Sequence, residues 1–197
     1  MIKGESTKES GRPRDTRIDA AVLSAAAELL AEVGYADLTM AAIADRAGTS
    51  RPAVYRRWPS KAHLVHEAAF GDGQDAGPVQ TGSFAADLRE VVRRTTEVLT
   101  TPLARLAVPG LVAEAATDTV LHQRLLERFS TEGWRGFDDY LAAAVDRGEL
   151  SADVDALVML EIVIGAVIAA MLIRGPDGLD DAWVDATTKI LLGGVGA

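Results

Sequence analysis

Residues that begin or end helices recur at short intervals in the first 70 positions of the chain. Gly34 follows apolar positions that repeat at helical spacing over residues 18–33, and a glycine there favours the left-handed conformation that ends a helix. Thr39 and Ser50 can each cap the short run that follows, and Gly48 stops the first of these runs. The pattern predicts four helices, over residues 16–33, 39–47, 50–58 and 61–70.

The rest of the chain is also typical of helices. Its long runs are dominated by Ala, Leu, Glu, Asp and Arg, which favour helix over strand, and hydrophobic residues make up 48% of the 197 positions, enough for a sizeable core. Pro109–Gly110 should interrupt the helix that contains it. We therefore predict an all-α protein of about nine helices, the last five over roughly 84–100, 103–116, 118–147, 153–173 and 179–193.

Charge is distributed unevenly along the chain. The net charge is -9, but residues 1–66 hold ten Lys and Arg against eight Asp and Glu, whereas residues 67–197 hold ten against 21. Between Thr39 and Lys61 there are five basic residues and one acidic residue, Asp45. A short basic segment on an acidic protein keeps nucleic acid open as a partner.

The second and third predicted helices, joined by Gly48-Thr49-Ser50, have the dimensions of a helix-turn-helix. Val54 and Trp58 lie four residues apart and would pack inward. Another face gathers residues that suit the major groove, where Arg can donate two hydrogen bonds to guanine: Arg51, Pro52, Tyr55 and Arg56. Phosphate contacts are more plausible for Tyr55, Arg57 and Lys61. Spacing alone equally allows a helical hairpin with a solvated charged face.

The run from Leu38 to Val65, LTMAAIADRAGTSRPAVYRRWPSKAHLV, closely resembles the signature of the tetracycline-repressor (TetR) family, and the helix before it ends in Val33-Gly34-Tyr35. The resemblance implies a DNA-binding domain over 16–70 and a ligand-binding and dimerisation domain over 84–197. The glycine-rich stretch from Gly71 to Gly82 predicts a connector between them, over 71–83. The resemblance also implies phosphate contacts at Thr39 and Lys61 and a recognition surface of Ser50, Arg51, Pro52, Ala53, Tyr55 and Arg56. Residues 1–15 form either a flexible arm that extends the DNA contact through Arg12 and Arg14, with Arg17 beside it, or a tail without a defined role.

The helices after the connector would supply a sensor for a small apolar effector. Mostly apolar residues with a few polar ones are typical of such pockets, although ordinary core packing explains most of them. The predicted pocket residues are Val92, Thr95, Leu99, Leu106, Val112, Glu114, Leu125, Phe129, Trp134, Phe137 and Tyr140. The resemblance implies a repressor that leaves its operator when the effector binds, although the sequence does not fix the sign of regulation.

The run from Leu157 to Ile173 contains one charged residue, Glu161. A membrane span is the rival interpretation, but a helix that is apolar nearly all round also suits burial between two subunits. The resemblance implies a dimer through the last two helices, which would read a palindromic DNA operator. The predicted interface residues are Glu161, Gly165, Ile168, Ala169, Leu172, Trp183, Ala186 and Ile190.

Other classes of protein are weakly supported by the sequence. The chain has no cysteine and three histidines, and it lacks the usual motifs of hydrolases, metalloproteases and nucleotide-binding enzymes, so we expect no enzyme, cofactor or metal. His63 and His66, three residues apart, are more plausibly ordinary side chains than metal ligands. The first 17 residues lack an apolar signal segment, which favours the cytoplasm. The alternative function is a helical dimeric interaction module without sequence-specific DNA binding.

Overall fold

The computed structural model describes residues 16–71, 81–119, 123 and 137–195. In these residues it contains nine α-helices, one 3₁₀ helix and no strand, which confirms the all-α class. The helices are α1 (Thr16–Asp37), α2 (Met40–Arg46), α3 (Arg51–Tyr55), α4 (Lys61–Phe70), α5 (Phe84–Thr100), α6 (Pro102–Ala115), α8 (Phe137–Asp146), α9 (Ala156–Arg174), η2 (Pro176–Gly178) and α10 (Asp181–Val195).

Most helix boundaries agree with the predicted ones. The backbone leaves the helical conformation at Gly34 (φ 75°, ψ 173°), where the first helix was predicted to end, and a further turn reaches Asp37. Helix α3 is shorter than predicted, but the hydrogen bond from Trp58 N to Val54 O, 3.0 Å, continues its pattern. Of the helix predicted over 118–147, the structure describes residues 118, 119, 123 and 137–147, which include α8. The rest of it lies outside the described residues, as do most of the connector and the N-terminal arm.

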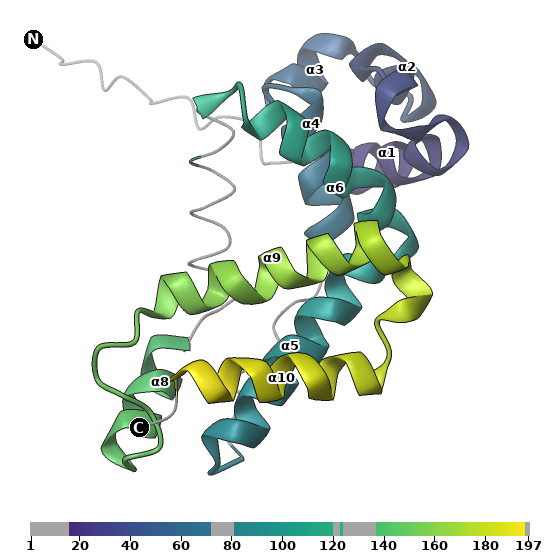
Figure 1. Cartoon of the computed structure of the whole chain (residues 1–197). Helices are drawn as coiled ribbons and strands as arrows, with labels where there is room; N and C mark the ends of the chain where they lie inside the picture. The colour runs from purple at the N-terminus through teal and green to yellow at the C-terminus, as the bar shows by residue number, and fades with distance from the viewer. Residues whose placement is uncertain (1–15, 72–80, 120–122, 124–136, 196–197) are drawn as a thin grey trace, which may run out of the picture.

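The molecule has two lobes, shown at the two ends of Figure 1. The upper lobe contains α1 to α4, and the lower lobe contains α5, α8, α9 and α10. Helix α6 follows α5 after a bend of 86° and packs against α1 and α4 of the upper lobe. Ala107 and Leu111 of α6 lie in the same apolar core as Val22, Ile43 and Leu64. The upper core is therefore completed by a helix from the second half of the chain.

The prediction that Pro109–Gly110 interrupts this helix is wrong, because α6 runs unbroken from Pro102 to Ala115. A proline inside a helix removes one backbone hydrogen bond and costs about 3 kcal/mol. Pro109 itself is exposed, whereas Ala107 and Leu111 on either side are buried against the upper lobe. Packing on that inner face compensates for the lost hydrogen bond.

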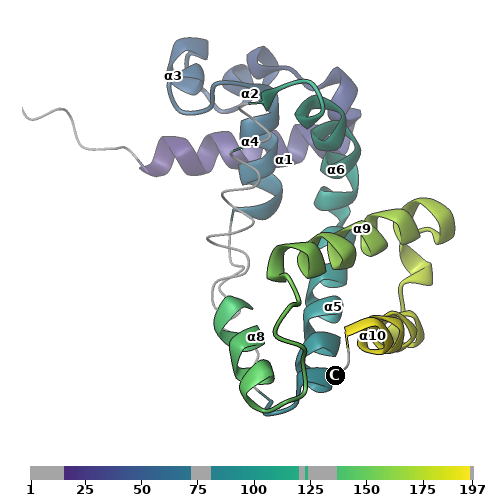
Figure 2. The same ribbon diagram turned by 60° about the vertical axis from the view of Figure 1, so that its left-hand side comes forward.

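The lower lobe is built around α5, against which α9 and α10 pack (Figure 2). Its core includes Leu88 and Val92 of α5 and Val163 of α9, all fully buried. Arg89 on α5 forms ion pairs with Asp181 and Asp185 on α10, at 3.1 and 2.6 Å. The lobe therefore joins helices that lie about 90 residues apart in the sequence.

Helix α9 is long and apolar enough to cross a membrane by length and composition alone. Only 28% of the most apolar 18-residue stretch of α9 is buried inside the described monomer. Several large apolar side chains on it are exposed instead, up to 79% for Leu172 and 82% for Ile173. In soluble proteins, large contiguous apolar patches that are exposed mark protein or membrane contact sites.

Candidate nucleic-acid interface

Local features of the chain set the turn between α2 and α3. Thr39 Oγ1 accepts a hydrogen bond from Ala42 N at 3.1 Å, and Ser50 Oγ accepts one from Ala53 N at 3.3 Å, so each short helix has a capped N-terminus. Gly48 between them has a φ of 65°, a left-handed conformation that a residue with a Cβ rarely adopts. The sequence therefore fixes the course of the chain from α2 into α3.

Helix α3 is held in place by its buried face. Val54 is 1% exposed and Trp58, just after the helix, is 4% exposed, which confirms the predicted packing face. Trp58 Nε1 also donates a hydrogen bond of 2.8 Å to Glu67 Oε2 on α4. Apolar burial and this bond together fix α3 on the upper lobe.

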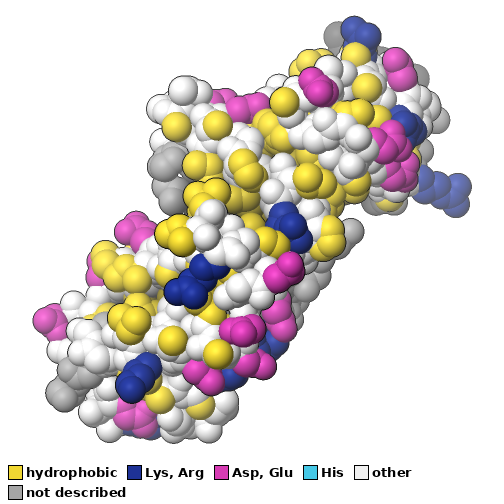
Figure 3. All heavy atoms as spheres, turned by 45° about the vertical axis from the view of Figure 1, so that its right-hand side comes forward, with side chains coloured by type: hydrophobic (Ala, Val, Ile, Leu, Met, Phe, Trp, Pro, Cys, Tyr) yellow, Lys and Arg dark blue, Asp and Glu magenta, His cyan; other side chains and the backbone are white. Residues whose placement is uncertain are grey.

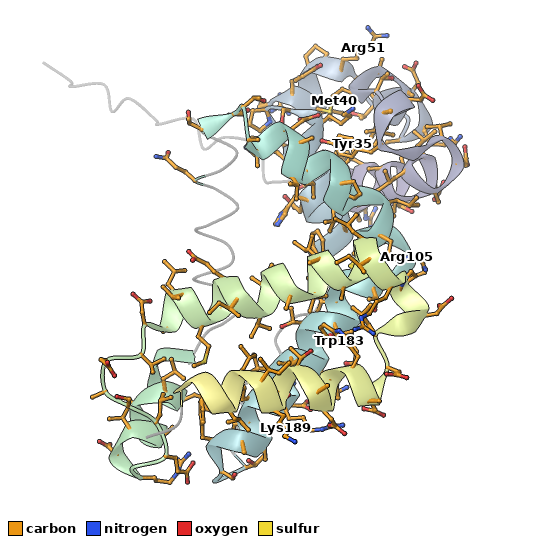
Figure 4. All side chains as sticks on the ribbon, in the orientation of Figure 1. Tyr35, Met40, Arg51, Arg105, Trp183 and Lys189 are labelled. Atoms are coloured by element: carbon orange, nitrogen blue, oxygen red, sulfur yellow. The ribbon has the colours of Figure 1, made fainter. Side chains whose placement is uncertain are left out.

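The opposite face of α3 is open to solvent. Arg51 points away from the body of the protein in Figure 4. Neither Arg51 nor Arg56 forms an ion pair with another described residue. Of the predicted recognition residues, Ala53 is half-buried, and the exposed ones are Ser50, Arg51, Pro52, Tyr55 and Arg56. Thr39, a predicted phosphate contact, is also exposed.

The other two predicted phosphate contacts, Arg57 and Lys61, make contacts inside the protein. Arg57 Nε forms an ion pair with Asp19 of α1. Lys61 Nζ donates a hydrogen bond of 2.9 Å to the backbone oxygen of Tyr35 and lies 4.3 Å from the centre of the Tyr35 ring. Its distance to Glu114 Oε1 of α6 is 3.9 Å. Arg57 therefore joins the segment after α3 to α1, whereas Lys61 joins α4 to both α1 and α6.

Tyr35 is the centre of this junction, and sequence reasoning missed it. Burial raises the pKa of the Tyr35 hydroxyl well above its usual range, and the nearby Glu114 carboxylate adds to the rise. The ring also lies directly on Gly110 of α6, where an added Cβ would come within 2.1 Å of Tyr35 Cδ1. No spacing in the sequence links Tyr35 to Lys61 or to the two α6 residues, Gly110 and Glu114, because the contacts are made between three different helices.

The predicted pocket residues divide into three groups. Val92, Thr95, Leu99 and Tyr140 are buried in the lower lobe, and two of them are hydrogen-bonded to backbone oxygens, Thr95 Oγ1 to Val91 O at 2.8 Å and Tyr140 OH to Phe84 O at 3.2 Å. Leu106 and Val112 are exposed, because α6 turns Ala104, Ala107 and Leu111 inward instead, and Glu114 lies at the Tyr35 junction. Leu125, Phe129, Trp134 and the side chain of Phe137 lie outside the described residues.

The predicted interface residues lie on α9 and α10 of the lower lobe. The exposed members are Glu161, Gly165, Ala169, Leu172, Ala186 and Ile190, and the half-buried ones are Ile168 and Trp183. Trp183 packs against two apolar clusters of its own chain, so it is also part of the monomer core. Figure 3 shows hydrophobic side chains exposed among charged ones on one face of the molecule.

We found no group of three or more His, Asp or Glu side chains suited to a metal ion among the residues that the structure describes.

Two family models match the chain. Residues 22–68 match the model described as bacterial regulatory proteins, tetR family, and residues 78–191 match the model described as tetracyclin repressor-like, C-terminal domain. A relative named DNA-binding transcriptional repressor TetR, from Mycobacteroides abscessus, is 30% identical over 84% of this chain and 86% of its own length.

Solved structures are similar over nearly the whole chain. The TetR family transcription regulator SCO0332 is 33% identical and aligns with a TM-score of 0.68 over 92% of this chain and 100% of its own. GusR of Salmonella enterica is 20% identical, with a TM-score of 0.67 over 93% of this chain and 98% of its own, a likeness that shows the fold alone.

Proposed function

The chain belongs to the TetR family of DNA-binding transcriptional regulators, and from this premise we propose that it is a repressor that binds a palindromic operator as a dimer and leaves it when a small apolar effector binds. The family is one of regulators rather than enzymes. We place its action in the cytoplasm, where DNA and metabolites are both accessible. The relative from Mycobacteroides abscessus is named a repressor, which supports this sign of regulation.

The observation that carries the proposal is the exposed face of α3. Its two arginines project from a helix that is fixed by buried Val54 and Trp58, so a groove of DNA can approach them without rearrangement of the core. Arg51 then reads bases, because a guanidinium can donate two hydrogen bonds to one guanine. Thr39, Tyr55 and Lys61 contact phosphates and supply affinity rather than sequence preference.

The exposed apolar surface of α9 and α10 supports the dimer. Leu172 is 79% exposed and Ile190 76% exposed, and a second copy of the chain would cover both. Gly165 and Ala169 are small residues on the exposed side of α9, and small residues let two helices approach closely. A two-fold dimer carries two copies of α3, and a palindromic operator with half-sites about 34 Å apart matches that symmetry.

We assign the DNA-binding function to residues 16–70 and the effector site and dimer contact to residues 84–197, with the connector 71–83 between them. Buried Val92, Thr95 and Leu99 of α5 are the pocket candidates that the described lower lobe supports best. Helix α6 packs on the upper lobe although it belongs to the second domain, so it is the element through which an effector would act on DNA binding.

The test is the affinity for duplex DNA, measured by fluorescence anisotropy over a series of salt concentrations. Affinity should fall steeply as salt rises, because phosphate contacts release counterions.

Arg51→Ala should cost about 1–3 kcal/mol on the preferred sequence and reduce base preference, whereas Lys61→Ala should weaken all sequences alike and lower the salt slope by about 1. Preferred duplexes come from selection out of a random pool. Equal losses on every sequence for both variants would refute the division of roles.

The family match argues against the alternative function, a helical dimeric interaction module without sequence-specific DNA binding, because the matching model and the relative are both DNA-binding regulators. The same titration separates the two functions. An interaction module would form dimers or larger complexes through α9 but would ignore duplex DNA even at low salt.

A further inference from the structure

Helices α1, α4 and α6 meet at four residues, which are Tyr35, Lys61, Gly110 and Glu114. Lys61 is the first residue of α4, and its ammonium group is 3.9 Å from the Glu114 carboxylate. The side chain of Lys61 is 22% exposed and that of Glu114 38% exposed, so solvent and a DNA phosphate can reach the pair. Lys61, a predicted phosphate contact, is thus also within ion-pair distance of a carboxylate of its own chain.

The two α6 residues of this junction act from one face of the helix. Gly110 and Glu114 are four residues apart, so they lie one above the other. The Tyr35 ring rests on the bare backbone of Gly110, which fixes how far α6 stands from α1. Any shift of α6 against the ring also changes the distance from Glu114 to Lys61. The strength of the ion pair therefore depends on the position of α6.

We propose that Glu114 is a positioning residue that competes with DNA phosphate for the Lys61 ammonium group, so that the position of α6 sets how readily Lys61 contacts DNA. The inference rests on the proposed function, in which Lys61 binds phosphate. In the DNA-free protein Glu114 and the Tyr35 backbone oxygen hold the cation. When α6 moves Glu114 away, the Lys61 ammonium group keeps only its hydrogen bond to the backbone oxygen of Tyr35. Less free energy is then needed for Lys61 to contact a DNA phosphate.

The test is a double-mutant cycle of Glu114→Gln and Lys61→Met, with DNA affinity as the readout. The probe is a fluorescein-labelled duplex of mixed sequence and about 30 base pairs, long enough for two half-sites one turn apart. Glu114→Gln should tighten binding by about two- to fivefold for each subunit, the range of a partly exposed ion pair. In the Lys61→Met background the same change should have no more effect than the control. Measurements at a salt concentration of about 50 mM keep the dissociation constants of the weaker variants within the measurable range.

Asp45→Asn is the matched control, because Asp45 is an exposed carboxylate in the upper lobe without an ion pair to any described residue. It removes the same charge and leaves Lys61 untouched. If Glu114→Gln tightened binding equally with and without Lys61, or no more than Asp45→Asn, the competition would be refuted and only general charge repulsion would remain. If the wild-type protein showed no salt-dependent DNA binding, the proposed function itself would fail, which is a separate result.

Discussion

Glu90 on α5 accepts hydrogen bonds from two arginines of the same helix. Arg93 Nη2 donates to Glu90 Oε1 at 2.6 Å, and Arg94 Nε donates to the same oxygen at 2.8 Å. The hydrogen bond from Arg93, supported by Arg94, lowers the pKa of Glu90 from 4.5 to about 2, against the opposing effect of partial burial. Glu90 therefore stabilises the folded state only while it is ionised.

This pKa shift predicts a pH dependence of the stability. Because the folded-state pKa lies below the unfolded value, the contribution of Glu90 is complete above pH 4.5 and is lost as the pH falls toward 2. The arginines are partly exposed, which limits the contribution to about 1 kcal/mol. Urea unfolding of wild type and Glu90→Gln should differ by this amount at pH 6, and the difference should shrink as the pH falls through the folded-state pKa of about 2. A constant difference over that range would contradict the assignment.

Individual side chains also mark the limit of sequence reasoning. The exposed face of α3 follows from helical spacing, since Val54 and Trp58 occupy the buried side. The same spacing does not reveal that Arg57 pairs with Asp19 or that Lys61 contacts Tyr35. These partners lie on another helix, so only the packing of α1 against α4 brings them together.

At the scale of helices, the contact between α1 and α6 predicts the effect of a small substitution. Alanine at a helical glycine usually adds about 0.5–1 kcal/mol of stability. At Gly110 the added Cβ would lie 2.1 Å from Tyr35 Cδ1, near the fixed base of the ring, so α6 must move. Gly110→Ala should therefore lower the unfolding free energy by about 1–3 kcal/mol, measured by urea denaturation.

Gly193→Ala is the control for this substitution. Gly193 is also helical, in α10, but its added Cβ would meet nothing within 4 Å. This variant should be as stable as wild type or slightly more so. A Gly110→Ala protein that behaved like Gly193→Ala would show that α6 is free to move away from Tyr35.

At the scale of the whole molecule, the exposed apolar surface of α9 predicts the oligomeric state. Leu172→Glu places a charge in the proposed dimer contact, where burial of an unpaired carboxylate is costly. Light scattering after gel filtration should then give the mass of one chain, 20.8 kDa, instead of two. DNA affinity should fall as well, because a monomer carries a single α3.

Leu106→Glu is the control, since Leu106 is exposed on α6, outside the proposed contact. It adds the same charge and should leave the dimer intact. A Leu172→Glu protein that remained a dimer, with unchanged DNA affinity, would place the subunit contact elsewhere on the chain.

The sequence determined the features that depend on neighbours within about four residues: the caps at Thr39 and Ser50, the breaks at Gly34 and Gly48, and the buried face of α3. Helix capping and periodicity are local, so they can be recognised in a single chain. Only the tertiary structure shows that α6 passes unbroken through Pro109 and completes the upper core. The contacts of Tyr35 with Gly110 and Lys61 also depend on the tertiary structure, because packing between distant helices, rather than local preference, creates them.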